Sequence, residues 1–193
     1  MASTSISLSY AFTLRVNIAV PPYPIGETPS GLRAYYDIKG GSITGPGLDA
    51  TIQRGGGDSL LQRSDGWANL DIHYPAKTKE GEWLYVRYIG VMQGTEALAK
   101  GKCTINPPAC PCGNRLLANF LFLFFFPCFA TALSKDPSAK STDFEDQYMR
   151  VTPSIETASE RLSWLNKAAF VGKGKLDVTP EGTFVVYECF KVE

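Results

Sequence analysis

The sequence lacks net charge and is poor in histidine. Its 193 residues contain 19 Lys and Arg against 19 Asp and Glu, and His73 is the only histidine. A balanced charge gives neither the basic footprint of a nucleic-acid-binding protein nor the polybasic cluster that holds proteins at membrane surfaces. We therefore expect a small-molecule partner that is not highly charged, and no nucleic acid.

Cysteine is scarce outside one short segment. Four of the five cysteines lie within residues 101–131, and only Cys189 lies elsewhere. This distribution is no disulfide framework, and the spacing lacks the paired C-x-x-C of a structural zinc site. Zinc signatures, dinucleotide fingerprints and nucleophile elbows are also missing, so we expect no metal and no cofactor. The N-terminus has no basic region followed by a long apolar stretch, which favours a reduced, cytoplasmic location.

Segment 101–131 differs in character from the rest of the chain. Gly101-Lys102-Cys103 can be encoded with the GTAAGT of a eukaryotic splice donor, and Ala118-Asn119 with a CTAAC branch sequence. The Phe-rich run 120–129 resembles a translated polypyrimidine tract, and Thr131-Ala132 can supply the acceptor. The segment therefore reads as a retained intron, whose removal keeps the frame and leaves about 162 residues, enough for one domain.

Two alternatives for this segment stay open. The mostly apolar run 116–133 approaches the length that spans a bilayer, so it could be a membrane anchor or an interfacial helix. It could also be a buried element of the fold. Asn119, Pro127 and the dominance of Phe argue against an anchor. We expect membrane contact only if this run belongs to the functional protein.

Most of the remaining sequence predicts short strands separated by turns. An alternating stretch runs from Ser5 to Val20 and stops at Pro21-Pro22, and clusters such as Arg54-Gly-Gly-Gly-Asp58 mark turns. The other predicted strands are 34–38, 41–44, 48–53, 66–74, 82–92, 147–152, 167–176 and 182–191.

Helical signals are few. Residues 94–100, continuing into 132–134 if the insert is removed, and residues 159–165 read as short helices. The expected fold is all-β: a single antiparallel, calycin-like β-barrel with one or two short helices. We expect one domain over residues 1–193, interrupted by the insert at 101–131, and either a monomer or a homodimer.

Several motifs in a fixed order resemble one known family. They are Gly40–Leu48, Arg54–Asp58, Leu70–Tyr74, Leu84–Val86, Tyr148–Pro153, Glu156-Thr157 and Trp164–Asn166. In these motifs the chain resembles the domain-of-unknown-function family 3237, small bacterial and fungal proteins, over nearly its whole length except the insert. The resemblance implies a β-barrel with a central pocket and, for fungal members, isomerases or cyclases of secondary metabolism. We expect a fungal member with a retained-intron insert.

One predicted strand carries the first candidates for catalysis. Alternation from Ala68 to Tyr74 places Asp71 and His73 on one face, and Leu70 and Ile72 on the other. If the polar face looks into the barrel, a carboxylate and the only imidazole share a pocket and can act as general acid and base near neutral pH. If it looks outward, both are exposed to solvent.

Other strands add arginines and tyrosines. Arg87 shares a face with Tyr85, as Arg150 does with Tyr148. An arginine fork suits an enolate, phenolate or carboxylate, and a tyrosine hydroxyl can donate to a developing oxyanion. Such pairs are also common as purely structural cross-strand contacts. The candidate catalytic residues are Asp71, His73, Tyr148 and Arg150, and the candidate substrate-binding residues are Tyr85, Arg87, Glu156, Trp164 and Asn166.

Two function hypotheses follow. The first is a cofactor-independent isomerase or cyclase that moves a proton on an aromatic or polyketide-like intermediate. The second is a non-catalytic, calycin-like binding protein for a hydrophobic small molecule. Asp58 enters neither hypothesis: it follows three glycines, but no Lys-Ser/Thr or helix follows it, so a β-turn explains it better than a phosphate cradle.

Overall fold

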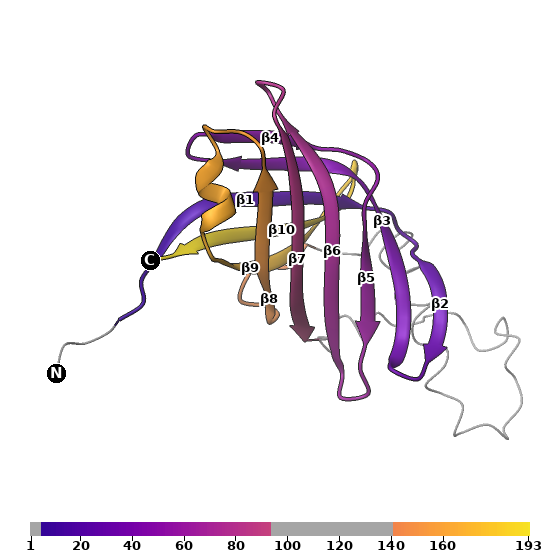
Figure 1. The fold of residues 1–193 in the computed structure, drawn as a ribbon. Helices are drawn as coiled ribbons and strands as arrows, with labels where there is room; N and C mark the ends of the chain where they lie inside the picture. Colours follow the sequence, from indigo (N-terminus) through magenta and orange to yellow (C-terminus); the bar gives the residue numbers. More distant parts are fainter. Residues whose placement is uncertain (1–4, 94–140) are drawn as a thin grey trace, which may run out of the picture.

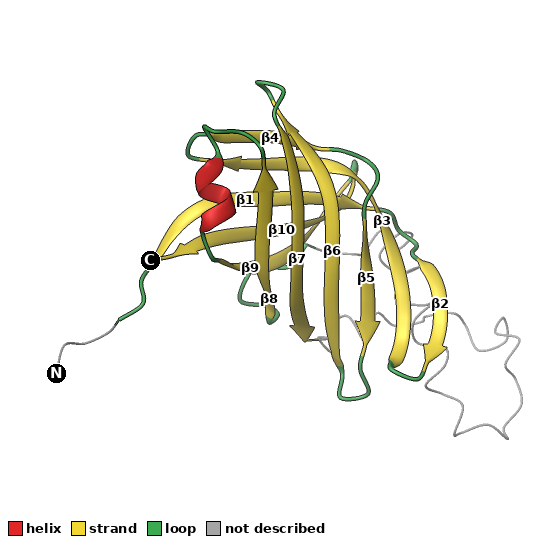
Figure 2. Ribbon diagram, in the orientation of Figure 1, coloured by secondary structure: helices red, strands yellow, loops and turns green. Residues whose placement is uncertain are grey.

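A computed structural model describes residues 5–93 and 141–193, which form one antiparallel sheet of ten strands (Figures 1 and 2). Segment 101–131 and the predicted helix at 94–100 lie outside the described residues. The strands are β1 Leu8–Ile18, β2 Tyr23–Thr28, β3 Gly31–Gly45, β4 Leu48–Ile52, β5 Gly57–Gln62, β6 Trp67–Thr78, β7 Trp83–Gln93, β8 Met149–Thr157, β9 Phe170–Thr179 and β10 Gly182–Val192.

The sheet closes on itself. Its order is β1-β10-β9-β8-β7-β6-β4-β3-β2, and β1 also pairs with β3, so the path returns to its start. Strand β5 fills the space between β3 and β6 by pairing with both. Figure 1 shows β3, β5, β6, β7 and β8 side by side, with β1 and β10 crossing behind them. The predicted all-β antiparallel barrel is confirmed.

The N-terminal half differs from the predicted strand pattern in three places: two predicted strands form one, and strands β2 and β5 were not predicted. Residues 34–38 and 41–44 belong to one long strand, β3, that continues through Gly40-Gly41. A Cβ at Gly41 would lie 2.0 Å from the Arg15 carbonyl oxygen, so these glycines allow β3 to bend closely against β1 rather than ending it. Strand β2 was not predicted, since the first alternating stretch was ended at Pro21-Pro22 and the next strand was expected only from Ala34. It pairs only with β3, and proline is tolerated on such an edge.

The second helical prediction is confirmed only as a single turn. Residues 163–167 form the 3-10 helix η2, which is the only helical element in the described ranges. No helix in those ranges is long and apolar enough to cross a lipid bilayer.

The interior follows the alternation of the strands. In β6, Ala68, Leu70, Ile72 and Tyr74 are buried, whereas the residues between them keep some exposure. Leu84, Val86 and Tyr88 of β7 continue the same layer. The inward positions of these strands are therefore occupied by packed apolar and tyrosine side chains, and Asp71 and His73 lie on the outer face.

Candidate functional site

Cross-strand pairs line up in rows across the outer face of the sheet. One row, which we call the arginine row, begins at Arg33 on β3 and ends at Arg150 on β8. Between them the register pairs Leu61 with Asn69 and Asn69 with Val91. Because side chains of cross-strand partners point to the same side of a sheet, these five residues form a continuous band.

A hollow lies over this row, which we call the outer hollow. Strands β3, β5, β6, β7, β8 and β9 contribute to its walls, and its charged and aromatic members are Arg33, Asp71, Tyr148 and Arg150. Leu61, Ile89, Val91 and Val171 supply apolar surface. The outer hollow thus combines the apolar surface and the few polar groups typical of a small-molecule site.

The hollow lies where two strand pairs loosen. The β5–β6 ladder pairs Asp58 with Ile72 and Leu61 with Asn69, but not the residues between them. Strands β8 and β9 pair only at two positions, Arg150 with Lys173 and Val151 with Gly172. A sheet with interrupted ladders can bend and expose backbone, which favours a depression at this place.

Asp71 is placed at the hollow by an ion pair. The Arg87 Nε lies 3.4 Å from the Asp71 Oδ1, and both side chains are about half-exposed. An exposed pair of this kind contributes little to stability. It does hold the Asp71 carboxylate in position without burying it, so the carboxylate stays accessible to a ligand.

Tyr148 and Arg150 form the opposite wall. The Arg150 guanidinium lies 4.6 Å from the centre of the Tyr148 ring and donates to the Met149 carbonyl at 3.0 Å. Trp67 packs edge-on against Tyr148 with ring centres 5.5 Å apart. Stacking restrains both side chains, so an arginine fork and a phenol are presented together.

The remaining outer-face candidates lie at different distances from the hollow. The next rows along the sheet pair His73 with Arg87, and then Tyr85 with Glu156. Tyr85 is six residues from Val91 along β7, or about 20 Å at the rise of a strand. His73 and Arg87 therefore border the hollow, whereas Tyr85 and Glu156 lie at the far end of the face.

Trp164 and Asn166 make contacts that stabilise the fold. The Asn166 side chain accepts from the Thr157 N–H at 2.8 Å and donates to the Thr157 carbonyl at 2.9 Å. Trp164 packs against Phe170 with ring centres 5.9 Å apart. Asn166 anchors η2 to the end of β8 and Trp164 packs it against the start of β9, and neither residue lines the outer hollow.

Asp58 is a residue whose position the sequence analysis missed. It lies within β5, not in a turn, and its Oδ1 accepts a hydrogen bond from the Asp71 N–H at 3.3 Å. Burial raises the pKa of the Asp58 carboxyl to about 7, while the Asp71 N–H lowers it and the Asp71 charge raises it. The preceding Gly57 could not carry a side chain, because its Cβ would lie 2.2 Å from the Tyr35 ring. Alternation through this Gly-rich strand was the one signal that could have placed Asp58 inside.

Buried tyrosines surround the Asp58 carboxyl. Burial raises the pKa of Tyr36, Tyr88 and Tyr187 above the ordinary value, and the nearby Asp58 charge adds to each shift. These phenols therefore stay protonated at neutral pH. Asp58 links this interior layer to the outer hollow through the Asp71 backbone.

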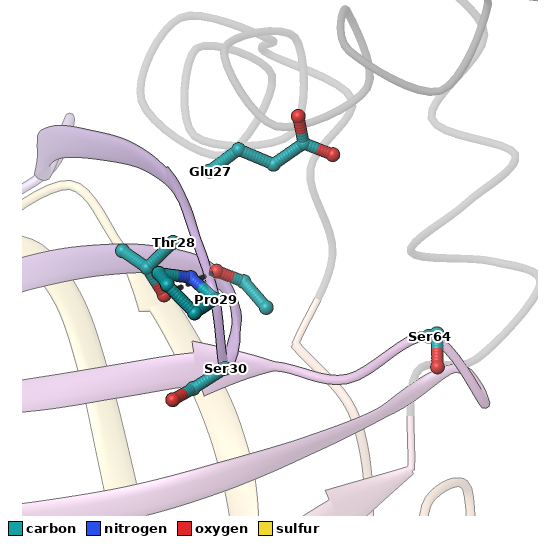
Figure 3. Close-up of a pocket in the computed structure, with 6 residues that line it drawn as sticks. Glu27, Thr28, Pro29, Ser30 and Ser64 are labelled. Atoms are coloured by element: carbon teal, nitrogen blue, oxygen red, sulfur yellow. Dashed lines mark hydrogen bonds between the residues drawn. The ribbon is translucent and has the colours of Figure 1, made fainter.

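A second hollow at the tip of the β2–β3 hairpin offers less chemistry. It is lined by Glu27, Thr28, Pro29, Ser30, Gly31 and Ser64 (Figure 3). The Thr28 hydroxyl already donates to the Gly31 carbonyl at 2.8 Å, and Glu27 extends away from the other labelled side chains. No group of three or more potential metal ligands occurs in the parts of the chain that the structure describes.

Fold and hollow together define a small β-barrel protein with an arginine-bearing depression on its outer face. Residues 6–107 and 127–192 match the family described as "Protein of unknown function (DUF3237)". The chain belongs to this family, as its motifs predicted.

Relatives and solved structures agree with this assignment. A UPF0311 protein of Rhodopseudomonas palustris strain TIE-1 is 29% identical over 100 residues, which cover 51% of this chain and 65% of that protein. A solved R. palustris protein of unknown function is 22% identical, with a TM-score of 0.71 over 99% of this chain and all of the other. An enzyme from Penicillium herquei is 20% identical, with a TM-score of 0.56 over 100% of this chain and 98% of its own. At these identities the solved structures support the fold alone.

Proposed function

We propose that this protein is a cofactor-independent isomerase or cyclase that acts on an aromatic or polyketide-like intermediate of secondary metabolism. The observation that carries the proposal is the convergence of Asp71, Tyr148 and Arg150 on one partly apolar hollow. These three groups supply a proton acceptor, a hydroxyl donor and a guanidinium fork. Acid–base chemistry at an activated C–H or O–H needs no further reagent.

The proposed reaction moves one proton. The Asp71 carboxylate takes a proton from a carbon next to a carbonyl group, and the electron pair moves onto the carbonyl oxygen. Arg150 and the Tyr148 hydroxyl stabilise that oxyanion, as preorganised donors do in other proton-transfer enzymes. Return of the proton to another atom completes an isomerisation. In a cyclisation, Asp71 instead takes the proton of a hydroxyl group whose oxygen adds to a C=C bond conjugated with the carbonyl group. The π electron pair of that bond moves onto the carbonyl oxygen as an enolate, and Asp71 then returns the proton to the carbon next to the carbonyl group.

Two further observations support an enzyme. Arg87 forms an ion pair with Asp71, and His73, the only histidine of the chain, lies in the next row as a second side chain capable of proton transfer. The similarity of fold to an enzyme from Penicillium herquei makes catalysis on this barrel plausible, although fold alone does not carry function.

Hydrogen–deuterium exchange tests the proposal. A panel of hydroxylated aromatic ketones and β-diketones is incubated with the full chain in D₂O, and exchange next to the carbonyl is followed by NMR. We expect accelerated exchange for at least one compound, and a loss of about 10²- to 10⁴-fold in Asp71→Asn. Asp49→Asn is the matched control, because Asp49 pairs with Lys79 on another part of the barrel.

The alternative is a non-catalytic binding protein for a hydrophobic small molecule. The exposed Ile89 and Tyr148 at the hollow favour it, since they offer apolar contact without chemistry. Compounds that bind without accelerated exchange would support this alternative. Exchange that survives in Asp71→Asn would contradict the assignment of Asp71.

We also propose that the chain is a fungal member of the family, that it forms a single barrel domain, and that segment 101–131 is a retained intron. The family match omits residues 108–126, within the suspected segment, which supports this reading. Amplifying and sequencing the cDNA across codons 100–132 tests it. A product shorter by the in-frame segment supports the intron, and a full-length product contradicts it.

A further inference from the structure

The two ends of the arginine row carry guanidinium groups that no carboxylate in residues 5–93 or 141–193 neutralises. Arg33 donates to the Ser59 carbonyl at 3.3 Å, and Arg150 donates to the Met149 carbonyl at 3.0 Å. Neither guanidinium forms an ion pair with a carboxylate of the described residues. By contrast, the carboxylate-paired arginines of the described chain are Arg15, Arg63, Arg87 and Arg161.

The missing ion pairs of Arg33 and Arg150 carry an energetic cost because both side chains are partly buried. Arg33 and Arg150 are both partly buried, whereas Arg54, which also lacks an ion pair to a described carboxylate, lies in an exposed turn. Removing a charge from water without an opposite charge is unfavourable. An anionic ligand between Arg33 and Arg150 would offset that penalty, and a neutral ligand would not.

The spacing of the row suits a small ligand. Four strand-to-strand steps separate Arg33 from Arg150, which is about 19 Å between backbones at the usual strand spacing. Both side chains line the same hollow, and each extends from its own strand, so the two guanidinium groups can approach one ligand. Leu61 and Val91 lie between them, and the Asn69 amide is the polar group at the centre.

Carboxylates near the row are already engaged. Asp71, the one carboxylate among the described residues that line the hollow, is held by Arg87. Lys173 continues the row beyond Arg150, but it pairs with Glu188 at 3.2 Å. Among the residues that the structure describes, Arg33 and Arg150 therefore remain as the cationic donors of the outer hollow without a carboxylate partner.

We propose that the outer hollow binds an aromatic or polyketide-like acid as its anion, with Arg33 and Arg150 as the two cationic groups that attract its acidic oxygens. This deepens the proposed function, on which it rests for the site, and it assigns Arg33 a role in ligand selection. The sequence analysis did not single out Arg33, because its partners in the row come from four other strands.

A charge-matched pair of probes tests the proposal. 2-Naphthoate and 2-naphthamide have nearly the same size and shape, but only the first is an anion. Their affinities for the full chain are measured by NMR titration at physiological salt. We expect 2-naphthoate to bind at least about 10-fold more tightly, since charge-assisted hydrogen bonds are stronger than neutral ones.

Variants connect that preference to the two arginines. Arg33→Gln and Arg150→Gln should each weaken 2-naphthoate about 10- to 100-fold and leave 2-naphthamide nearly unchanged. Arg33→Lys keeps the positive charge and should lose less affinity for 2-naphthoate than Arg33→Gln does. Arg15→Gln is the matched control, because Arg15 is similarly buried but pairs with Asp177 at 3.0 Å outside the hollow. Thermal unfolding of each variant checks that it is folded.

The outcomes separate this inference from the proposed function. Equal affinity for the two probes, no binding of 2-naphthoate, or an unchanged preference in folded Arg33→Gln would overturn the inference. Charge-selective binding without proton exchange would keep it and reject the enzyme. Accelerated proton exchange without a preference for the anionic probe would keep the proposed enzyme and reject the inference on anion binding.

Discussion

The two faces of the sheet use the same residue types for different purposes. Tyr88 is 2% exposed and packs inside the barrel, whereas Tyr148 is 46% exposed and lies at the outer hollow. Asp58 points toward the buried tyrosines, whereas Asp71, in the adjacent strand, faces outward and pairs with Arg87. Residue type therefore does not decide between structure and chemistry in this barrel. The side of the sheet decides it, because burial removes a group from both solvent and ligand.

The largest effect is expected from exchanging the two tyrosines for alanine. Tyr88→Ala leaves a cavity among packed rings and should lower the free energy of unfolding by about 3–5 kcal/mol. Tyr148→Ala loses its contacts with Arg150 and Trp67 and should lower it by about 1 kcal/mol. Denaturant unfolding of both variants measures the difference. Similar losses in the two would contradict the assignment of the faces.

The next largest effect is the pH dependence of stability, which should differ between Asp58 and Asp71. The pKa of Asp58 is raised by burial from 3.8 to about 7 in the folded chain. Between pH 4 and 7 the unfolded chain loses this proton while the folded chain keeps it. The Asp58 contribution to stability is therefore present at low pH and is lost as the pH rises to 7, by up to about 4 kcal/mol.

Asp58→Asn removes that contribution. We expect its free energy of unfolding to decline less than that of the unsubstituted chain between pH 4 and 7, as measured by denaturant titration at several pH values. Asp71→Asn, on the exposed side, should change stability by less than about 1 kcal/mol. An identical decline with pH in Asp58→Asn and the unsubstituted chain would show that Asp58 is not held as a buried acid.

The smallest effect is expected from Asn166→Ala, which tests whether the region around η2 stabilises the fold without taking part in binding. Asn166→Ala breaks both hydrogen bonds to Thr157 and should destabilise the chain by about 1–3 kcal/mol. It should not alter 2-naphthoate affinity, because Asn166 lies outside the outer hollow. A loss of 2-naphthoate affinity without a loss of stability would show that Asn166 takes part in binding.

Much of the barrel could be predicted from local patterns. Alternation identified β6, β7 and β10 closely, since one face of each strand is apolar. It failed where local residues and tertiary contacts disagree. Strand β5 begins at the last of three glycines, and its first residues were read as a turn. Pairing with β3 and β6, which no local pattern shows, makes this segment a strand.

The candidate site was predictable only in part. Tyr148 and Arg150 share a face by their spacing, and the structure brings Asp71 to the same hollow. Tyr85 met the same spacing rule with Arg87, but it pairs with Glu156 about 20 Å along the sheet from the arginine row. Spacing within one strand fixes which residues share a face, but it carries no information on register between strands.

The sequence by itself determined the all-β class, the alternation of buried and exposed positions, and the membership of a family. These depend on local periodicity and on motif order, both of which are properties of the sequence alone. Only the tertiary structure decided that the polar face of β6 looks outward, that Asp58 is enclosed, and that Arg33 and Arg150 end one row. The physical reason is that closure and register join strands that are remote in sequence, and a shift of one residue would turn each side chain to the other face.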